Sequence, residues 1–285
     1  MRFSLKMIAL LILSAMPMVS KAQFANGDSI NPCHVKVSAS TYGIARLASL
    51  DTYLSGYEHF GGGYFYNHEN FRDARAGKHM WKYQTLFSVK AGFTELNNIY
   101  ASNQYVLMLN RSWSGFYKLH TDGNMDFYGG AQMQLTGGAI YAPANSNNPV
   151  AAKLQTSLAA TGMAIYHTDG QAFRIQLDVP LIGAAFSPGF GQSYYEIFGL
   201  GNYSNIIHLT HPGNAPSWRF MVTYDCELGQ KRNTTLRISF IDEVLQSDIN
   251  DIRTSIRDIS LSVGFVKTLY KIKGNSPLKP YNPFQ

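Results

Sequence analysis

Apolar and polar residues alternate along most of the chain with a period of two, which is the signature of a strand that has two different faces. In residues 125–141 the odd positions carry no charged or amide side chain, whereas most even positions are polar. The same pattern runs through residues 150–167, where Thr156 interrupts the apolar face. These segments are much longer than the strands of soluble proteins, which average about 5–6 residues.

The alternating segments and the turns between them predict about ten antiparallel strands. Short turn signals are found at residues 121–124, 168–170 and 229–232. Longer connections separate them, at residues 92–103, 142–149, 187–216 and 245–253. The predicted strands span residues 34–46, 58–70, 79–91, 104–120, 125–141, 150–167, 171–185, 217–227, 233–244 and 255–270. Residues 203–210 are a further candidate strand, so the expected number ranges from eight to twelve.

Aromatic residues gather near the ends of the apolar faces, for example at Trp81, Phe93, Trp113, Tyr141 and Trp218. Membrane barrels have such girdles because Trp and Tyr prefer the level of the lipid headgroups. An even number of strands, with short inner turns and longer outer loops, is also typical of outer-membrane barrels. We therefore predict an all-β fold, a transmembrane antiparallel β-barrel. A secreted soluble β-sandwich that binds a ligand is one alternative.

The N-terminal segment has the pattern of an export signal. Arg2 and Lys6 precede an uncharged, mostly apolar stretch over residues 7–19, which is too short to span a bilayer. Small residues at Ser20 and Ala22 complete the pattern of a cleaved signal peptide over residues 1–22. Residues 23–285 would then form one barrel domain in a bacterial outer membrane, with both termini in the periplasm. Its expected partners are outer-membrane lipid, lipopolysaccharide and the barrel insertion machinery.

Composition and charge narrow the possible functions. Charged residues make up 15% of the chain, against about 25% in soluble domains, and 18 Tyr, 17 Phe and 25 Gly replace them. A chain with so little charge and so many aromatics is neither disordered nor a coiled coil. Loss of Arg2, Lys6 and Lys21 with the signal lowers the net charge from +6 to +3. We therefore expect no nucleic-acid partner, which requires a clustered basic stripe; the oligomeric state stays open.

The two cysteines are expected to be free thiols. Cys33 begins the first predicted strand and Cys226 ends the eighth. These strands are not neighbours in a ring of ten, and a disulfide needs Cα atoms within roughly 7 Å of each other.

The polar faces of the predicted strands carry charges of both signs. Ten strands enclose a space that side chains can largely fill, far below the 16–18 strands of a water-filled porin. We therefore expect a paired polar network, with a narrow polar conduit or a small-ligand site as the alternative. The charged residues expected inside are Asp126, Lys153, Arg174, Asp178, Arg219, Asp225 and Arg237.

The longest connection, residues 187–216, contains candidates for a lipid-modifying hydrolase of the outer leaflet. Ser193, Glu196 and His208 would supply a nucleophile, an acid and a base if they assembled at the rim. Residues 191–195 nevertheless lack the closing glycine of a nucleophile elbow. We expect instead an aromatic loop that folds over the barrel mouth. His208 and His211 have no companion ligands in a zinc-binding pattern, so no metal or cofactor is expected.

Two motifs resemble an uncharacterised family of Gram-negative exported proteins, a domain of unknown function. The first is LDTYLS at residues 50–55, followed by Tyr57 and two glycines at 61–62. The second is VPLIG at residues 179–183, which leads into GQSYYE at residues 191–196. The resemblance implies an outer-membrane barrel that spans nearly the whole mature chain, and it implies no activity.

Both motifs fall at the outer rim of the predicted topology. Asp51 and Tyr53 lie in the first outer loop, whereas Tyr194 and Tyr195 lie in the fourth. We take these four residues as a candidate binding motif. The sequence thus predicts a structural or interaction barrel, or a narrow passage, with functional extracellular loops, and it assigns no reaction.

Overall fold

A computed structural model describes residues 34–75, 78–96, 99–146, 148–228 and 234–271. The predicted signal peptide, residues 1–22, and Cys33 lie outside these residues. The described elements are β1 (His34–Asp51), β2 (Ser55–Arg75), β3 (Lys78–Leu96), β4 (Ile99–Asp122), β5 (Met125–Tyr141), β6 (Val150–Thr168), β7 (Gln171–Phe186), α2 (Tyr194–Phe198), β8 (Ile207–Thr210), β9 (Trp218–Leu228), β10 (Thr234–Ile249) and β11 (Ile252–Lys271). No helix of the described residues is long and apolar enough to cross a membrane.

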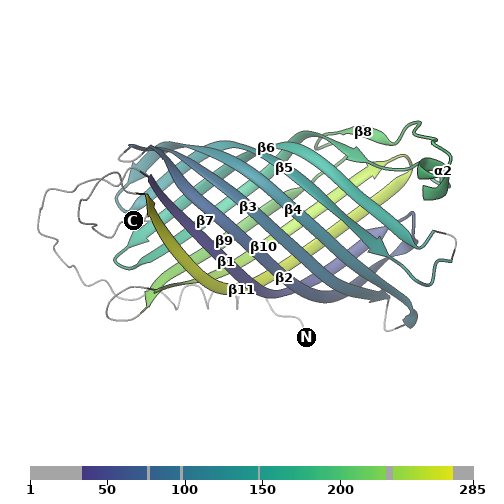
Figure 1. Ribbon diagram of the computed structural model, residues 1–285, viewed down its shortest axis with the longest axis horizontal. Coiled ribbons are helices and arrows are strands. Elements are labelled where there is room, and N and C mark those ends of the chain that lie inside the picture. Colours follow the sequence, from purple (N-terminus) through teal and green to yellow (C-terminus); the bar gives the residue numbers. More distant parts are fainter. Residues whose placement is uncertain (1–33, 76–77, 97–98, 147, 229–233, 272–285) are drawn as a thin grey trace, which may run out of the picture. The chain divides into compact units, whose positions relative to one another are not determined.

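Ten of these strands form one closed antiparallel barrel (Figure 1). Each strand pairs with its neighbour in sequence, and β11 closes the ring on β1 from His34↔Lys271 to Asp51↔Thr254. The prediction of an antiparallel barrel with about ten strands is confirmed. The alternative of a soluble sandwich is wrong, because a single sheet closes on itself instead of two sheets packing face to face.

The short strand β8 stands outside the ring. It confirms the candidate strand within residues 203–210, but it pairs only with the C-terminal end of β7, from Gly183↔Thr210 to Phe186↔Ile207. The ladder between β7 and β9 ends at Asp178↔Arg219. Beyond that level β8 replaces β9 as the partner of β7.

Two connections that the sequence predicted to be long are shorter in the structure. The predicted long connection at residues 245–253 is wrong: β10 and β11 pair up to Ile249↔Ile252, and only Asn250 and Asp251 form the turn. Their φ angles of 56° and 59° are the left-handed values that a tight type I′ hairpin requires. Strands β3 and β4 likewise pair as far as Leu96↔Ile99 within the predicted connection 92–103. The predicted strands ended too early because apolar residues in these hairpins, such as Ile249 and Ile252, no longer follow a regular alternation.

Strands β1 and β11 approach each other closely at two glycines. A Cβ atom on Gly264 would lie 1.8 Å from the carbonyl oxygen of Ser40, and one on Gly43 would lie 2.0 Å from that of Leu261. Larger side chains are therefore excluded where the barrel closes.

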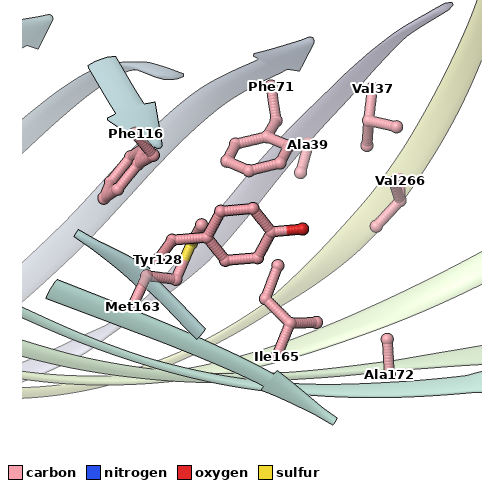
Figure 2. Close-up of a cluster of buried hydrophobic side chains, with 9 residues drawn as sticks. All are labelled: Val37, Ala39, Phe71, Phe116, Tyr128, Met163, Ile165, Ala172 and Val266. Atoms are coloured by element: carbon pink, nitrogen blue, oxygen red, sulfur yellow. The ribbon is translucent and has the colours of Figure 1, made fainter. Parts of the chain in front are cut away.

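The two surfaces of the barrel wall differ as the alternation predicted. Large apolar side chains are exposed on the outside, among them Leu109, Met133, Leu158 and Leu261. Inside, apolar clusters share the space with polar side chains. One cluster contains Phe71, Phe116, Tyr128, Met163 and Ile165, whose side chains fill the interior between strands (Figure 2). Two further clusters contain Leu47, Phe65, Leu86, Met221 and Ile241, and Val106, Met108, Ile140 and Ile256.

Candidate functional site

An ion-pair network crosses the interior of the barrel. Its centre is Glu69 on β2, whose two oxygens accept hydrogen bonds of 2.7 and 2.8 Å from the Arg174 guanidinium on β7. Arg237 on β10 also donates to Glu69. The same guanidinium makes two bonds of 2.6 Å with Asp225 on β9. Four strands from opposite sides of the ring are therefore joined by charge-assisted hydrogen bonds.

Further ion pairs lie beside this network. Arg219 donates bonds of 2.9 and 2.7 Å to Asp178, and its guanidinium also reaches Asn110 and Ser112 on β4. Lys90 on β3 contacts both Glu243 and Asp258. The buried charged side chains of the described residues are five acids and five bases, namely Asp51, Glu69, Asp178, Asp225, Asp258, Lys82, Lys90, Arg174, Arg219 and Arg237. The interior is therefore electrically balanced, as low-dielectric surroundings require.

The structure places five of the charges expected inside, Arg174, Asp178, Arg219, Asp225 and Arg237, in these buried pairs. Asp126 does not join them. It lies near the β4–β5 turn, where Lys118 is 2.6 Å from its carboxylate and the His167 ring is 3.4 Å away.

The sequence interpretation missed Glu69, the centre of the network. Phe65 on the same strand is buried while Tyr64 is exposed, so aromatic residues on both faces hide the period of two. Glu243 and Asp258 were missed because each stands next to another charged residue. The sequence carries no signal that Arg174 and Arg237 pair with Glu69, since these arginines are 105 and 168 positions away from it.

The two motifs of the candidate rim site meet at the barrel end that carries the β1–β2 turn. The Tyr53 hydroxyl donates a 2.9 Å bond to the carbonyl oxygen of Gln192, and its ring packs edge-on against Tyr194 at 5.7 Å between centroids. The Tyr194 hydroxyl accepts a 2.7 Å bond from the Ala152 amide on β6. We call Tyr53 and Tyr194 the tyrosine latch, because they tie the β1–β2 turn to the long loop. Tyr195 is 71% exposed and takes no part in it.

Burial and nearby acids raise the pKa values of both tyrosines of the latch. Burial, followed by the charges of Asp51 and Glu196, raises the pKa of Tyr53 above its usual value. Burial also raises the pKa of Tyr194, and the neighbouring Tyr53 and Asp51 add to the effect. Both hydroxyls therefore stay protonated well into the alkaline range.

Asp51 forms a buried ion pair near the latch. Its carboxylate is fully buried and contacts Lys153, which reaches across the mouth from β6. Lys153 Nζ also donates a 2.9 Å bond to the Thr254 hydroxyl on β11. This ion pair joins the two sides of the barrel opening, and its partners leave Asp51 no exposed atom to offer a ligand.

The three hydrolase candidates do not assemble. The Ser193 hydroxyl accepts a 3.2 Å bond from the Glu196 amide, and the Glu196 carboxylate accepts a 3.2 Å bond from the Ser193 amide. Both side chains thereby cap α2 as a capping box. His208 lies instead 2.9 Å from the Asn205 carbonyl oxygen and 2.8 Å from the Asn250 amide nitrogen. No hydrogen bond joins His208 to Ser193 in the described part of the chain.

A polar cavity of about 400 Å³ opens at the same end of the barrel. Its lining contains no acid, lysine or arginine. It comes from the N-terminal parts of β2 and β4 and from the β5–β6 loop, with His59, Asn103, Gln104 and Asn145 as the main hydrogen-bonding groups. No cluster of described residues has the composition of a metal site. Cys226 is a free thiol.

The amino-acid sequence of the chain matches one protein family. A family model described as "Protein of unknown function (DUF3316)" matches residues 5–276. The chain belongs to this family. The DUF3316 match confirms the resemblance to an uncharacterised family that the motifs suggested. No curated protein matches the chain.

Solved structures that resemble this DUF3316 member are outer-membrane β-barrels. The outer-membrane protease OmpT of Escherichia coli shares 6% identity, with 84% of this chain and 97% of that chain covered and a TM-score of 0.46. Neisserial surface protein A shares 10% identity over 84% and 97% of the two chains, with a TM-score of 0.36. Ail of Yersinia pestis shares 12% identity over 81% and 99%, with a TM-score of 0.30. At these scores the likeness assigns no function to the DUF3316 chain.

Proposed function

We propose that this protein is a non-conducting outer-membrane barrel that binds a small uncharged ligand at its outer mouth. The packed, ion-paired interior supports the first part, since three apolar clusters and the buried salt bridges lie inside the barrel. The apolar exterior supports a membrane location. A soluble protein rarely exposes contiguous apolar area of more than a few hundred Å². In this barrel nearly every strand contributes exposed apolar side chains to the outer surface.

The orientation follows from the lengths of the connections. The two longest connections between barrel strands, residues 142–149 and 187–217, lie at the same end. Longer loops face outward in bacterial barrels, so this end is the extracellular one and both termini face the periplasm. The surrounding outer-membrane lipid and lipopolysaccharide and the barrel insertion machinery are then the expected partners, after cleavage of residues 1–22.

The hydrogen-bonding groups of the cavity carry the proposal of a ligand. Asn103 Oδ1 is buried without a hydrogen-bond partner. His59 Nδ1 lies 2.9 Å from the carbonyl oxygen of Tyr57, so it carries the hydrogen of that bond and leaves Nε2 available to a ligand. Gln104 accepts a bond from Ser49 through Oε1, which leaves its amide hydrogens as donors. Uncharged acceptors and donors around a concavity of this size suit a sugar or a similar polyhydroxylated molecule.

Saturation-transfer NMR with glucose, galactose, N-acetylglucosamine and lactose tests this function on the protein in detergent micelles. Gln104→Leu removes one donor and should weaken binding by about five-fold, since one hydrogen bond contributes about 1 kcal/mol. Gln246→Leu is the matched control, because Gln246 bonds to Ser255 and does not line the cavity. Absence of saturable binding of all four sugars at millimolar concentration would overturn the proposal, as would an equal loss in both variants.

A further inference from the structure

The longest outer connection carries a large apolar surface outside the barrel. Seven of its large side chains are between 61% and 71% exposed, namely Phe190, Tyr195, Phe198, Leu200, Tyr203, Ile207 and Leu209. Exposed apolar area of this kind marks an interaction surface. The elements α2 and β8, which carry most of it, lie at the outer end of β7 (Figure 1). We call residues 187–217 the flap.

The pairing of β8 shows which way its side chains point. Directly opposite residues in an antiparallel ladder lie on the same face of the sheet. Leu209 is opposite Ala184, and Ile207 is opposite Phe186, which is opposite Leu154 on β6. Leu154 belongs to the apolar outer face and is 53% exposed. Strand β8 therefore continues the outer face of β6 and β7 sideways by one further strand.

The helix α2 packs onto the same face. The Phe186 ring stacks on Tyr194 at 6.2 Å and on Phe198 at 6.4 Å between centroids. Phe198 nevertheless remains 64% exposed on its other side. The aromatic stack begins at the tyrosine latch on the rim and ends in an exposed ring beside the outer wall.

The charge of the flap distinguishes lipid from other occupants. Among its 31 positions, residues 187–217 contain one carboxylate, Glu196, and no lysine, arginine or aspartate. That carboxylate is held by the amide of Ser193 in the capping box. Charged side chains are costly in hydrocarbon, whereas aromatic residues favour the interface.

We propose that the flap lies in the outer leaflet, with Phe198, Ile207 and Leu209 in contact with acyl chains. The flap then widens the lipid-facing wall on the β7 side, where β9 no longer pairs with β7. The occupant is membrane lipid, because the flap surface is continuous with the lipid-facing wall and is nearly free of charge.

Depth-dependent quenching tests this placement in the full chain. In a Cys33→Ser/Cys226→Ser background, Phe198→Cys and Leu209→Cys are labelled with an environment-sensitive fluorophore. The protein is reconstituted in phosphatidylcholine vesicles that contain doxyl-labelled phosphatidylcholine. Ile175→Cys, on the outer face of β7, is the lipid-facing control, and Ala144→Cys, in the exposed β5–β6 loop, is the aqueous control.

The expected result is that labels at 198 and 209 are quenched by doxyl lipid to an extent similar to the label at 175, and are protected from aqueous iodide. The label at 144 should show the reverse. Circular dichroism verifies that each labelled protein keeps its strand content. Iodide quenching at both 198 and 209, equal to that at 144, would overturn the proposal and leave the flap as a water-exposed surface for a protein.

Discussion

Replacement of Arg237 by methionine tests whether the interior ion pairs hold the barrel together. Arg237 is fully buried and makes two 2.6 Å bonds with Asp225 and one bond with Glu69. Without it, Asp225 loses its guanidinium partner, whereas Glu69 keeps the two bonds from Arg174. One carboxylate is then buried without a counter-charge. Loss of one partner of a buried pair costs about 3–5 kcal/mol, and we expect that decrease in the free energy of unfolding.

A double variant separates the charge imbalance from lost packing. Arg237→Met/Asp225→Leu removes both partners of the bidentate pair and restores electrical balance. Replacement of a buried pair by apolar residues is often neutral, so the double variant should regain most of the stability. Unfolding by guanidinium in phospholipid vesicles, followed by tryptophan fluorescence, measures both values. A cost below about 1 kcal/mol for the single variant, or a double variant no more stable than the single one, would refute the reasoning.

Three further predictions concern the rim and the closure of the barrel. The raised pKa values of Tyr53 and Tyr194 mean that their stabilisation of the rim is complete below pH about 10. This stabilisation is lost as the pH rises through their folded-state pKa values. In a titration followed by tyrosinate absorbance, the component that titrates at the highest pH should disappear in Tyr53→Phe/Tyr194→Phe. A titration curve equal to that of the wild type would contradict this. Asn250→Val places a β-branched residue at φ 56° and removes the bonds of the Asn250 amide to the flap. Hydrogen exchange of the flap should accelerate in Asn250→Val, and unchanged exchange would show that the hairpin does not hold it. Gly264→Ala should abolish refolding into vesicles, measured by circular dichroism, since the added Cβ would meet the Ser40 carbonyl oxygen. A stably folded variant would contradict the close approach of β1 and β11.

The strands and the two faces of the wall were predictable because each lipid-facing position repeats the same constraint. In β5, every odd position meets the apolar exterior and most even positions meet the interior, so the period of two is clear. The hairpins were less predictable, since their apolar residues, such as Ile249 and Ile252, do not alternate regularly with polar ones. Asn250 and Asp251 are a good turn pair, but the alternation that marked β10 had ended several residues earlier.

The contacts between interior residues were not predictable from the pattern. Alternation indicates that Arg174 and Arg237 point inward, but it cannot indicate which acid meets them across the ring. Glu69 pairs with both because the closed barrel brings β2 opposite β7 and within three strands of β10. The rim shows the same limit: topology assigns Tyr53 and Tyr194 to one end, whereas their ring contact depends on how the flap folds.

Conductance of the purified protein in planar lipid bilayers tests the central claim most directly, because a lumen filled by ion pairs and apolar clusters leaves no aqueous path. We predict no stable current steps for the wild-type protein at any applied voltage that the bilayer tolerates. Stable channels of nanosiemens conductance would contradict a packed interior.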